Sequence, residues 1–77
     1  MIVLEQREFE SLIHKVIAAM EEAGYDPAAQ FTGYFQTGDE TFITRSGEAR
    51  TIVRSLDKEQ MADYLETHYP HFKSGVL

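Results

Sequence analysis

The fold class is decided by residues 9–20, which read FESLIHKVIAAM. Apolar residues recur in this stretch at intervals of three and four, which places them on one broad face of an amphipathic helix. They are Phe9, Leu12, Ile13, Val16, Ile17 and Met20. Gly24 follows the last strong helix formers and suits the left-handed position at which a helix ends. The pattern therefore predicts a first helix over residues 5–23.

A second helix is predicted over residues 27–37. Asp26 is a favourable N-cap, and Pro27 is tolerated at the first helical position because the N–H that it lacks would be unpaired there. Gly38 ends the segment. Gly33 lies inside it and costs about 1 kcal/mol of helix propensity relative to alanine. We expect another backbone segment to pack closely against Gly33, which would explain the residue.

Two further helices are predicted over residues 47–55 and 58–69. Their apolar stripes are Ala49, Ile52, Val53 and Leu56 in the former, and Met61, Tyr64 and Leu65 in the latter. Asp57 precedes Gln60 by three residues, which is the spacing of a capping box. Pro70 ends the last helix, and residues 70–77 are expected to form a loose tail.

Between the second and third predicted helices, Thr41-Phe42-Ile43-Thr44 is interpreted as a short extended segment. We expect either Phe42 or Ile43 to reach the core from it. With 77 residues, the chain is a single domain, 1–77, of all-α class: a small bundle of about four short helices. It has no cysteine to form a disulfide, and a domain of this size buries a limited apolar area, so a homodimer is expected.

Charge narrows the choice of partners. Seven Lys and Arg residues against thirteen Asp and Glu residues give a net charge of −6, which disfavours nucleic acid and anionic membranes. The basic residues cluster in one window, as Arg45, Arg50, Arg54 and Lys58, whereas acidic residues are concentrated in the first third. This polarity favours pairing within the fold or across a dimer. An anionic partner and plain solvated charge are the alternatives.

The chain carries no pattern that predicts membrane insertion or export. Residues 1–4 are apolar but are followed by acid, unlike a signal peptide, and no apolar run approaches the ~20 residues of a membrane helix. We therefore expect a cytoplasmic protein.

The chemistry-bearing residues indicate no catalytic, metal or cofactor site. His68 and His71 are three apart, but Pro70 interrupts the helix between them, so a solvated pair is expected. His14 is expected at the polar boundary of the first helix. The serine and threonine hydroxyls stand beside no base or oxyanion loop. The sequence therefore predicts a protein that is not an enzyme.

Residues 24–39, GYDPAAQFTGYFQTGD, resemble the signature segment of the IreB family, small cytoplasmic regulatory phosphoproteins of Gram-positive bacteria. The resemblance extends from about residue 9 to residue 69. The positions that carry it include Gly24, Tyr25, Pro27, Gln30, Gly33, Tyr34, Gly38, Asp39, Ala49, Arg50 and Arg54.

The resemblance implies a helical homodimer without enzymatic activity that acts by protein–protein interaction. It implies regulation by a transmembrane Ser/Thr kinase with extracellular peptidoglycan-sensing repeats, and by an opposing phosphatase. The implied output is control of the cell-envelope stress response and of resistance to cell-wall antibiotics. The expected working surface is the loop from Gly38 to Ser46 together with the face of Arg50 and Arg54.

One departure from the family concerns the phospho-acceptor. Family members carry an N-terminal arm whose threonines are the kinase targets, whereas no threonine precedes Thr32 here. We therefore expect the arm to be missing. The acceptor would then be Thr41 or Thr44, or the protein would be a shortened relative that is regulated otherwise. The alternative function is a small acidic structural or interaction subunit of a larger complex, without a phospho-switch.

Overall fold

The computed structural model describes residues 4–72, and this part of the chain is entirely helical, with no strand. Its elements are α1 (Gln6–Glu22), α2 (Pro27–Thr37), the 3₁₀ turns η1 (Glu40–Phe42) and η2 (Ser46–Glu48), α3 (Ala49–Ser55) and α4 (Lys58–His68). The all-α prediction is confirmed. No helix among these residues is long and apolar enough to cross a membrane.

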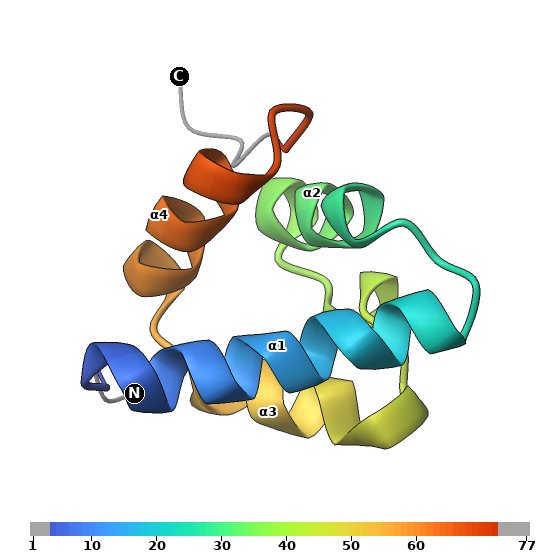
Figure 1. The fold of residues 1–77 in the computed structure, drawn as a ribbon. Helices are drawn as coiled ribbons and strands as arrows, with labels where there is room; N and C mark the ends of the chain where they lie inside the picture. The colour runs from blue at the N-terminus through green and yellow to red at the C-terminus, as the bar shows by residue number, and fades with distance from the viewer. Residues whose placement is uncertain (1–3, 73–77) are drawn as a thin grey trace.

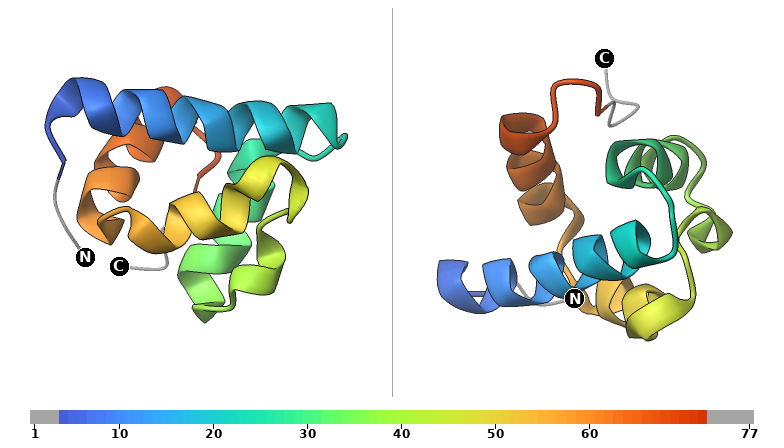
Figure 2. Two further views of the ribbon diagram at one scale, coloured as in Figure 1. Left: turned by 90° about the horizontal axis from the view of Figure 1, so that it is seen from below. Right: turned by 45° about the vertical axis from the view of Figure 1, so that its right-hand side comes forward.

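The longest helix, α1, organises the others. It lies side by side with α3 and η2, while α2 and α4 rise on the same side of α1 in Figure 1. The two further views in Figure 2 show the same arrangement from below and after a turn about the vertical axis. The η1 turn packs against α2, so the segment between α2 and α3 stays close to the helices that it joins.

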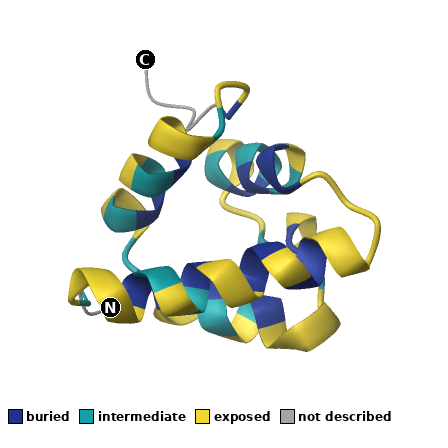
Figure 3. Cartoon of the chain, in the orientation of Figure 1, coloured by how far each residue is buried: buried dark blue, intermediate teal, exposed yellow. Residues whose placement is uncertain are grey.

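The core is apolar throughout. The largest fully buried side chains come from every α-helix and from the segment between α2 and α3: Phe9, Ile13, Val16, Met20, Phe31, Ile43, Val53, Leu56, Met61 and Leu65. Among the described residues no polar or charged residue is buried. Figure 3 shows these buried positions on the sides of the helices that face one another. Burial of these side chains is the main source of stability, since each contributes roughly 1.5–3 kcal/mol.

The connection between α1 and α2 is fixed by local chemistry that the sequence predicts. Gly24 adopts a left-handed φ of +87°, its N–H donates to the carbonyl of Glu21 over 3.0 Å, and the N–H of Tyr25 donates to Met20 over 2.9 Å. These two bonds are the Schellman pattern. Asp26 Oδ1 then accepts from the Ala28 N–H at 3.2 Å and caps α2.

The start of α4 departs from the predicted capping box. Asp57 Oδ2 accepts from the Gln60 N–H at 2.9 Å, as expected of the cap. The Gln60 side chain, however, does not return to Asp57: its Oε1 accepts from the Leu4 N–H at 3.2 Å and its Nε2 donates to the Leu4 carbonyl at 2.8 Å. A side-chain amide can accept a hydrogen bond from the N–H of a residue and donate one to its carbonyl. Gln60 therefore connects the segment before α1 to α4.

Residues 41–44 do not form the predicted extended segment. Thr41 and Phe42 belong to the η1 turn, and Ile43, which follows it, is extended, with φ −95° and ψ 132°. Ile43 is fully buried, whereas Phe42 is 45% exposed. The Asp39 side chain caps the turn, and this local hydrogen bonding prevails over the β propensity of the threonines and Ile43.

Gly33 is in close contact as predicted, but the neighbour is a side chain and not a backbone. A Cβ built on Gly33 would lie 2.4 Å from Cδ1 of the Phe42 ring. The ring therefore packs directly on the α2 backbone.

The prediction of a loose tail from residue 70 is wrong for Phe72. This side chain is only 5% exposed and its ring meets Phe35 edge-on, with ring centroids 5.2 Å apart. Residues 73–77 lie outside the described part of the chain.

Candidate functional site

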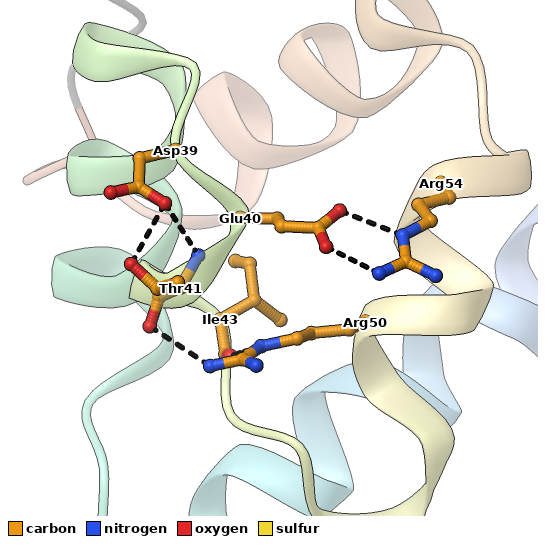
Figure 4. Close-up of polar contacts among 6 residues, drawn as sticks. All are labelled: Asp39, Glu40, Thr41, Ile43, Arg50 and Arg54. Atoms are coloured by element: carbon orange, nitrogen blue, oxygen red, sulfur yellow. Dashed lines mark hydrogen bonds and ion pairs between the residues drawn. The ribbon is translucent and has the colours of Figure 1, made fainter.

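The candidate site is the loop of residues 38–46, which joins α2 to η2. Gly38 ends α2 with a left-handed φ of +72°, and its N–H donates to the Tyr34 carbonyl at 2.8 Å. Asp39 Oδ1 then accepts two bonds from Thr41, from the backbone N–H at 3.0 Å and from the hydroxyl at 2.8 Å (Figure 4). These bonds, the backbone bond most of all, hold the pKa of Asp39 below its ordinary value.

Two arginines of α3 reach across to this loop. Arg50 and Arg54 are four residues apart and therefore share a helix face. Arg50 Nε donates to the Ile43 carbonyl at 2.7 Å and its Nη2 donates to the Thr41 carbonyl at 3.3 Å. Arg54 forms a two-point ion pair with Glu40, through Nε at 2.7 Å and also through Nη2 (Figure 4). The hydrogen bond from Arg54 is the main reason that the pKa of Glu40 is lowered.

The loop is also tied to α2 and to the core. Gln30 Oε1 accepts from the Thr44 N–H at 3.0 Å, and the Thr44 hydroxyl oxygen accepts from the Ser46 N–H at 3.2 Å. Ile43 is the one loop residue that is fully buried. The loop backbone is therefore held from α2, from α3 and from the core at the same time.

A shallow groove of about 550 Å³ lies along this loop. It is lined by Tyr25, Gln30, Thr41, Phe42, Ile43, Thr44, Arg45, Ser46 and Arg50. No carboxylate is among these lining residues, although the whole protein carries a net charge of −6. Phe42 and Arg45 fall within the predicted surface loop, but neither belongs to a helical stripe or to a recognisable motif that would single it out.

The residues that carry the family resemblance lie in three parts of the structure: the core, the surroundings of the loop, and the α1–α2 connection. Pro27, Tyr34 and Ala49 are buried. Burial, followed by the charge of Glu40, raises the pKa of the Tyr34 phenol, and Lys58 Nζ lies 5.2 Å from its ring centroid. The structure gathers a separate group around the loop: Gln30, Gly33, Gly38, Asp39, Arg50 and Arg54. Gly24 and Tyr25 lie at the α1–α2 connection, and Tyr25 also borders the groove.

The candidate phospho-acceptors, Thr41 and Thr44, differ in exposure. The Thr41 residue is exposed and its hydroxyl donates to Asp39, whereas Thr44 is half-buried and its N–H is tied to Gln30. In the observed structure the exposed hydroxyl of Thr41 is therefore the more accessible of the two.

His68 and His71 are both exposed, which agrees with the solvated pair that the sequence suggests. The His68 ring stacks on Tyr64 with ring centroids 4.0 Å apart, and its Nδ1 lies 2.8 Å from the Tyr64 carbonyl. His14 Nε2 lies 3.0 Å from the Tyr64 hydroxyl, and His71 is exposed. Residues 4–72 contain no group of three or more His, Cys, Asp or Glu side chains that could hold a metal ion. The contact between His14 and Tyr64 joins α1 to α4, whereas the stack of His68 on Tyr64 lies within α4.

The fold and the site define a small all-helical domain with one surface loop that is held in place by hydrogen bonds and an ion pair. The sequence model of a family described as IreB regulatory phosphoprotein matches residues 3–70. A UPF0297 protein of Ruminiclostridium cellulolyticum is 36% identical over 69 residues, which is 83% of this chain and 78% of that protein. The chain therefore belongs to the IreB family, which confirms the resemblance seen in its sequence, and the family description is of a regulatory protein rather than an enzyme.

Proposed function

We propose that this protein is a non-enzymatic cytoplasmic regulator that acts by binding other proteins. It takes part in Ser/Thr-kinase-linked control of cell-envelope stress and of resistance to cell-wall antibiotics. The observation that carries the proposal is that the chain belongs to a family of regulatory phosphoproteins and that its exposed loop of residues 38–46 is held in place by Asp39, Arg50 and Arg54. A loop fixed by a rigid scaffold is a common site of recognition.

The kinase and its opposing phosphatase would act on this loop, and Thr41 is the acceptor that its exposure favours. A phosphate adds a charge of about −1.5 to −2 at neutral pH. On Thr41 it would stand beside Asp39, whose Oδ1 is 2.8 Å from the hydroxyl, and next in sequence to Glu40. The same phosphate would compete with Glu40 for the guanidinium group of Arg54 and with the loop carbonyls for that of Arg50. Phosphorylation would therefore replace the ion pair and hydrogen bonds that hold the loop and change its shape.

The test is to incubate the purified protein with the host's envelope-sensing Ser/Thr kinase and ATP, and to locate added phosphate by intact-mass and peptide mass spectrometry. We expect one phosphate on Thr41, which the Thr41→Ala variant loses and the Thr44→Ala variant keeps. The reverse pattern would move the acceptor to Thr44. If conditions that modify a relative with an N-terminal threonine arm add no mass, the kinase link fails. The reading as an acidic interaction subunit then takes its place, and a stable complex of fixed stoichiometry would support it.

The homodimer is the second part of the proposal. A small domain gains core area by pairing with a second copy. Light scattering on the purified protein at low and high salt tests this. We expect the mass of two chains at low salt, and a monomer at all concentrations would contradict it.

A further inference from the structure

The groove along the loop gathers features that the phospho-switch does not use. Tyr25 is 52% exposed and Phe42 is 45% exposed, and they are the large hydrophobic residues that the described chain leaves exposed. They come from different segments, the α1–α2 connection and η1, yet both line this groove. Exposed aromatic side chains that converge on one depression are typical of an interaction site.

The charge of the groove is equally distinctive. Arg50 and Arg54 are committed to loop carbonyls and to Glu40, but no hydrogen bond or ion pair of the Arg45 side chain is found among residues 4–72. Glu48 borders an adjoining depression together with Arg45 without forming an ion pair with it. The groove therefore presents a guanidinium group without a counter-ion beside two exposed rings.

The Phe42 ring and the loop backbone that carries Arg45 are positioned by the fold. The Phe42 ring rests on Gly33, where a Cβ would meet it at 2.4 Å, so the site depends on glycine at that point of α2. Arg50 and Gln30 together hold the peptide group between Ile43 and Thr44, through bonds of 2.7 Å to its carbonyl and 3.0 Å from its N–H. A surface that is ordered before binding loses less conformational entropy when a partner docks.

We propose that this groove binds an extended segment of a partner protein that presents a carboxylate next to an aromatic or aliphatic side chain. The carboxylate pairs with the Arg45 guanidinium, whose two-pronged geometry matches it, and the apolar side chain lies between Tyr25 and Phe42. The proposal rests on the proposed function, that the protein acts by binding other proteins, and it specifies the chemistry of the bound segment. A free anion would leave the two exposed rings without a role, and a polynucleotide would be repelled by the net charge of −6.

The first experiment is peptide selection on the immobilised full-length protein with a random heptapeptide display library. We expect enrichment of peptides with Asp or Glu within two positions of an aromatic or aliphatic residue. Arg45→Glu reverses the charge at the groove, and Arg7→Glu makes the same change in α1, at a residue that does not line the groove. The selected peptides should bind Arg45→Glu at least about tenfold more weakly, since like charges are brought together, and should bind Arg7→Glu unchanged.

A second readout separates binding from folding. Because the Arg45 side chain forms no hydrogen bond or ion pair with residues 4–72, Arg45→Glu should keep the urea midpoint of the wild-type protein. A selected peptide, synthesised and titrated into the ¹⁵N-labelled protein, should shift the amide signals of Tyr25 and of residues 42–46. Absence of enrichment, equal affinity for Arg45→Glu, or shifts elsewhere on the surface would each overturn the proposal. A change in the oligomer mass of Arg45→Glu would also overturn it, because the groove would then be an interface between two copies of this chain.

Complementation of a strain that lacks the gene distinguishes this proposal from the proposed function. We expect the wild type and Arg7→Glu to restore the normal response to a cell-wall antibiotic, and Arg45→Glu to fail. If Arg45→Glu also restores it, the groove proposal falls and the regulatory function stands. If deletion of the gene changes nothing, the regulatory function falls, while the peptide selection still decides the fate of the groove.

Discussion

The α1–α3 core and the loop of residues 38–46 are stabilised in contrasting ways. The core holds Phe9, Ile13, Val16, Met20 and Val53 in apolar contact, without a buried charge. The loop buries one side chain, Ile43, and is otherwise held by hydrogen bonds and an ion pair to its neighbours. Apolar burial is strong but non-directional, whereas these polar bonds are weak but fix orientation. The core therefore provides the stability of the domain, and the loop provides a defined surface.

The same substitution in both regions tests this comparison most directly. Phe9→Ala removes a fully buried ring that also meets Tyr64 edge-on at 5.9 Å, and should cost about 3–5 kcal/mol of unfolding free energy. Phe42→Ala removes a ring that is 45% exposed and should cost less than about 1.5 kcal/mol. Urea unfolding followed by circular dichroism measures both. Equal losses would mean that the loop is as much a part of the core as α1.

Ile43→Ala should have the next largest effect, because it removes the one fully buried side chain of the loop. We expect a loss of about 2–5 kcal/mol, together with fast hydrogen exchange at the Thr44 amide, which now donates to Gln30. The matched control is Ile52→Ala in α3, a half-buried position at which the loss should be smaller and Thr44 should stay protected. Protection of Thr44 in Ile43→Ala would show that the polar bonds hold the loop by themselves.

A smaller effect is expected where the two regions touch, at Gly33 and Phe42. In the Phe42→Ala background, Gly33→Ala should stabilise the protein by about 1 kcal/mol, because α2 gains helix propensity and no ring opposes the new Cβ. In the wild-type background the added Cβ must displace the Phe42 ring, so the gain should disappear. A double-mutant cycle measures this coupling. Equal effects of Gly33→Ala in both backgrounds would contradict the contact.

The smallest effect is on stability at acidic pH, to which two carboxyl groups of the loop should contribute. The pKa values of Asp39 and Glu40 are lowered in the folded state, by hydrogen bonds from Thr41 and from Arg54 respectively. Their contribution is therefore present above the ordinary carboxyl pKa of about 4, and is lost as the pH falls through the folded values. Carboxyl ¹³C NMR titration should show both shifts.

Arg54→Gln supplies the control for this titration. It should return the pKa of Glu40 towards its ordinary value and leave that of Asp39 lowered, because Asp39 depends mainly on Thr41. Arg7→Gln removes a positive charge from α1 and should change neither carboxyl group. If Arg54→Gln left the pKa of Glu40 unchanged, the ion pair would not be formed in solution.

The features that could be predicted from sequence are those decided by near neighbours along the chain. The α1 stripe, the left-handed turn at Gly24 and the Asp26 cap each depend on residues within one or two helical turns. The sequence-based predictions were wrong where residues that are far apart in the chain come into contact. Gln60 binds the backbone of Leu4, fifty-six positions away, instead of completing a capping box. The Phe42 side chain packs on Gly33, where a second backbone was expected.

The sequence by itself determined the all-helical class and the main helix boundaries, because helical periodicity, caps and terminating glycines act locally. Only the tertiary structure decided what the basic window does. Packing of α3 beside α1 aims Arg50 and Arg54 at the loop, where they bind carbonyls and Glu40, and leaves Arg45 without a partner among the described residues. It also brings Tyr25 and Phe42 into one groove. These relations depend on the distances between side chains of separate elements, which a linear pattern of residue types does not specify.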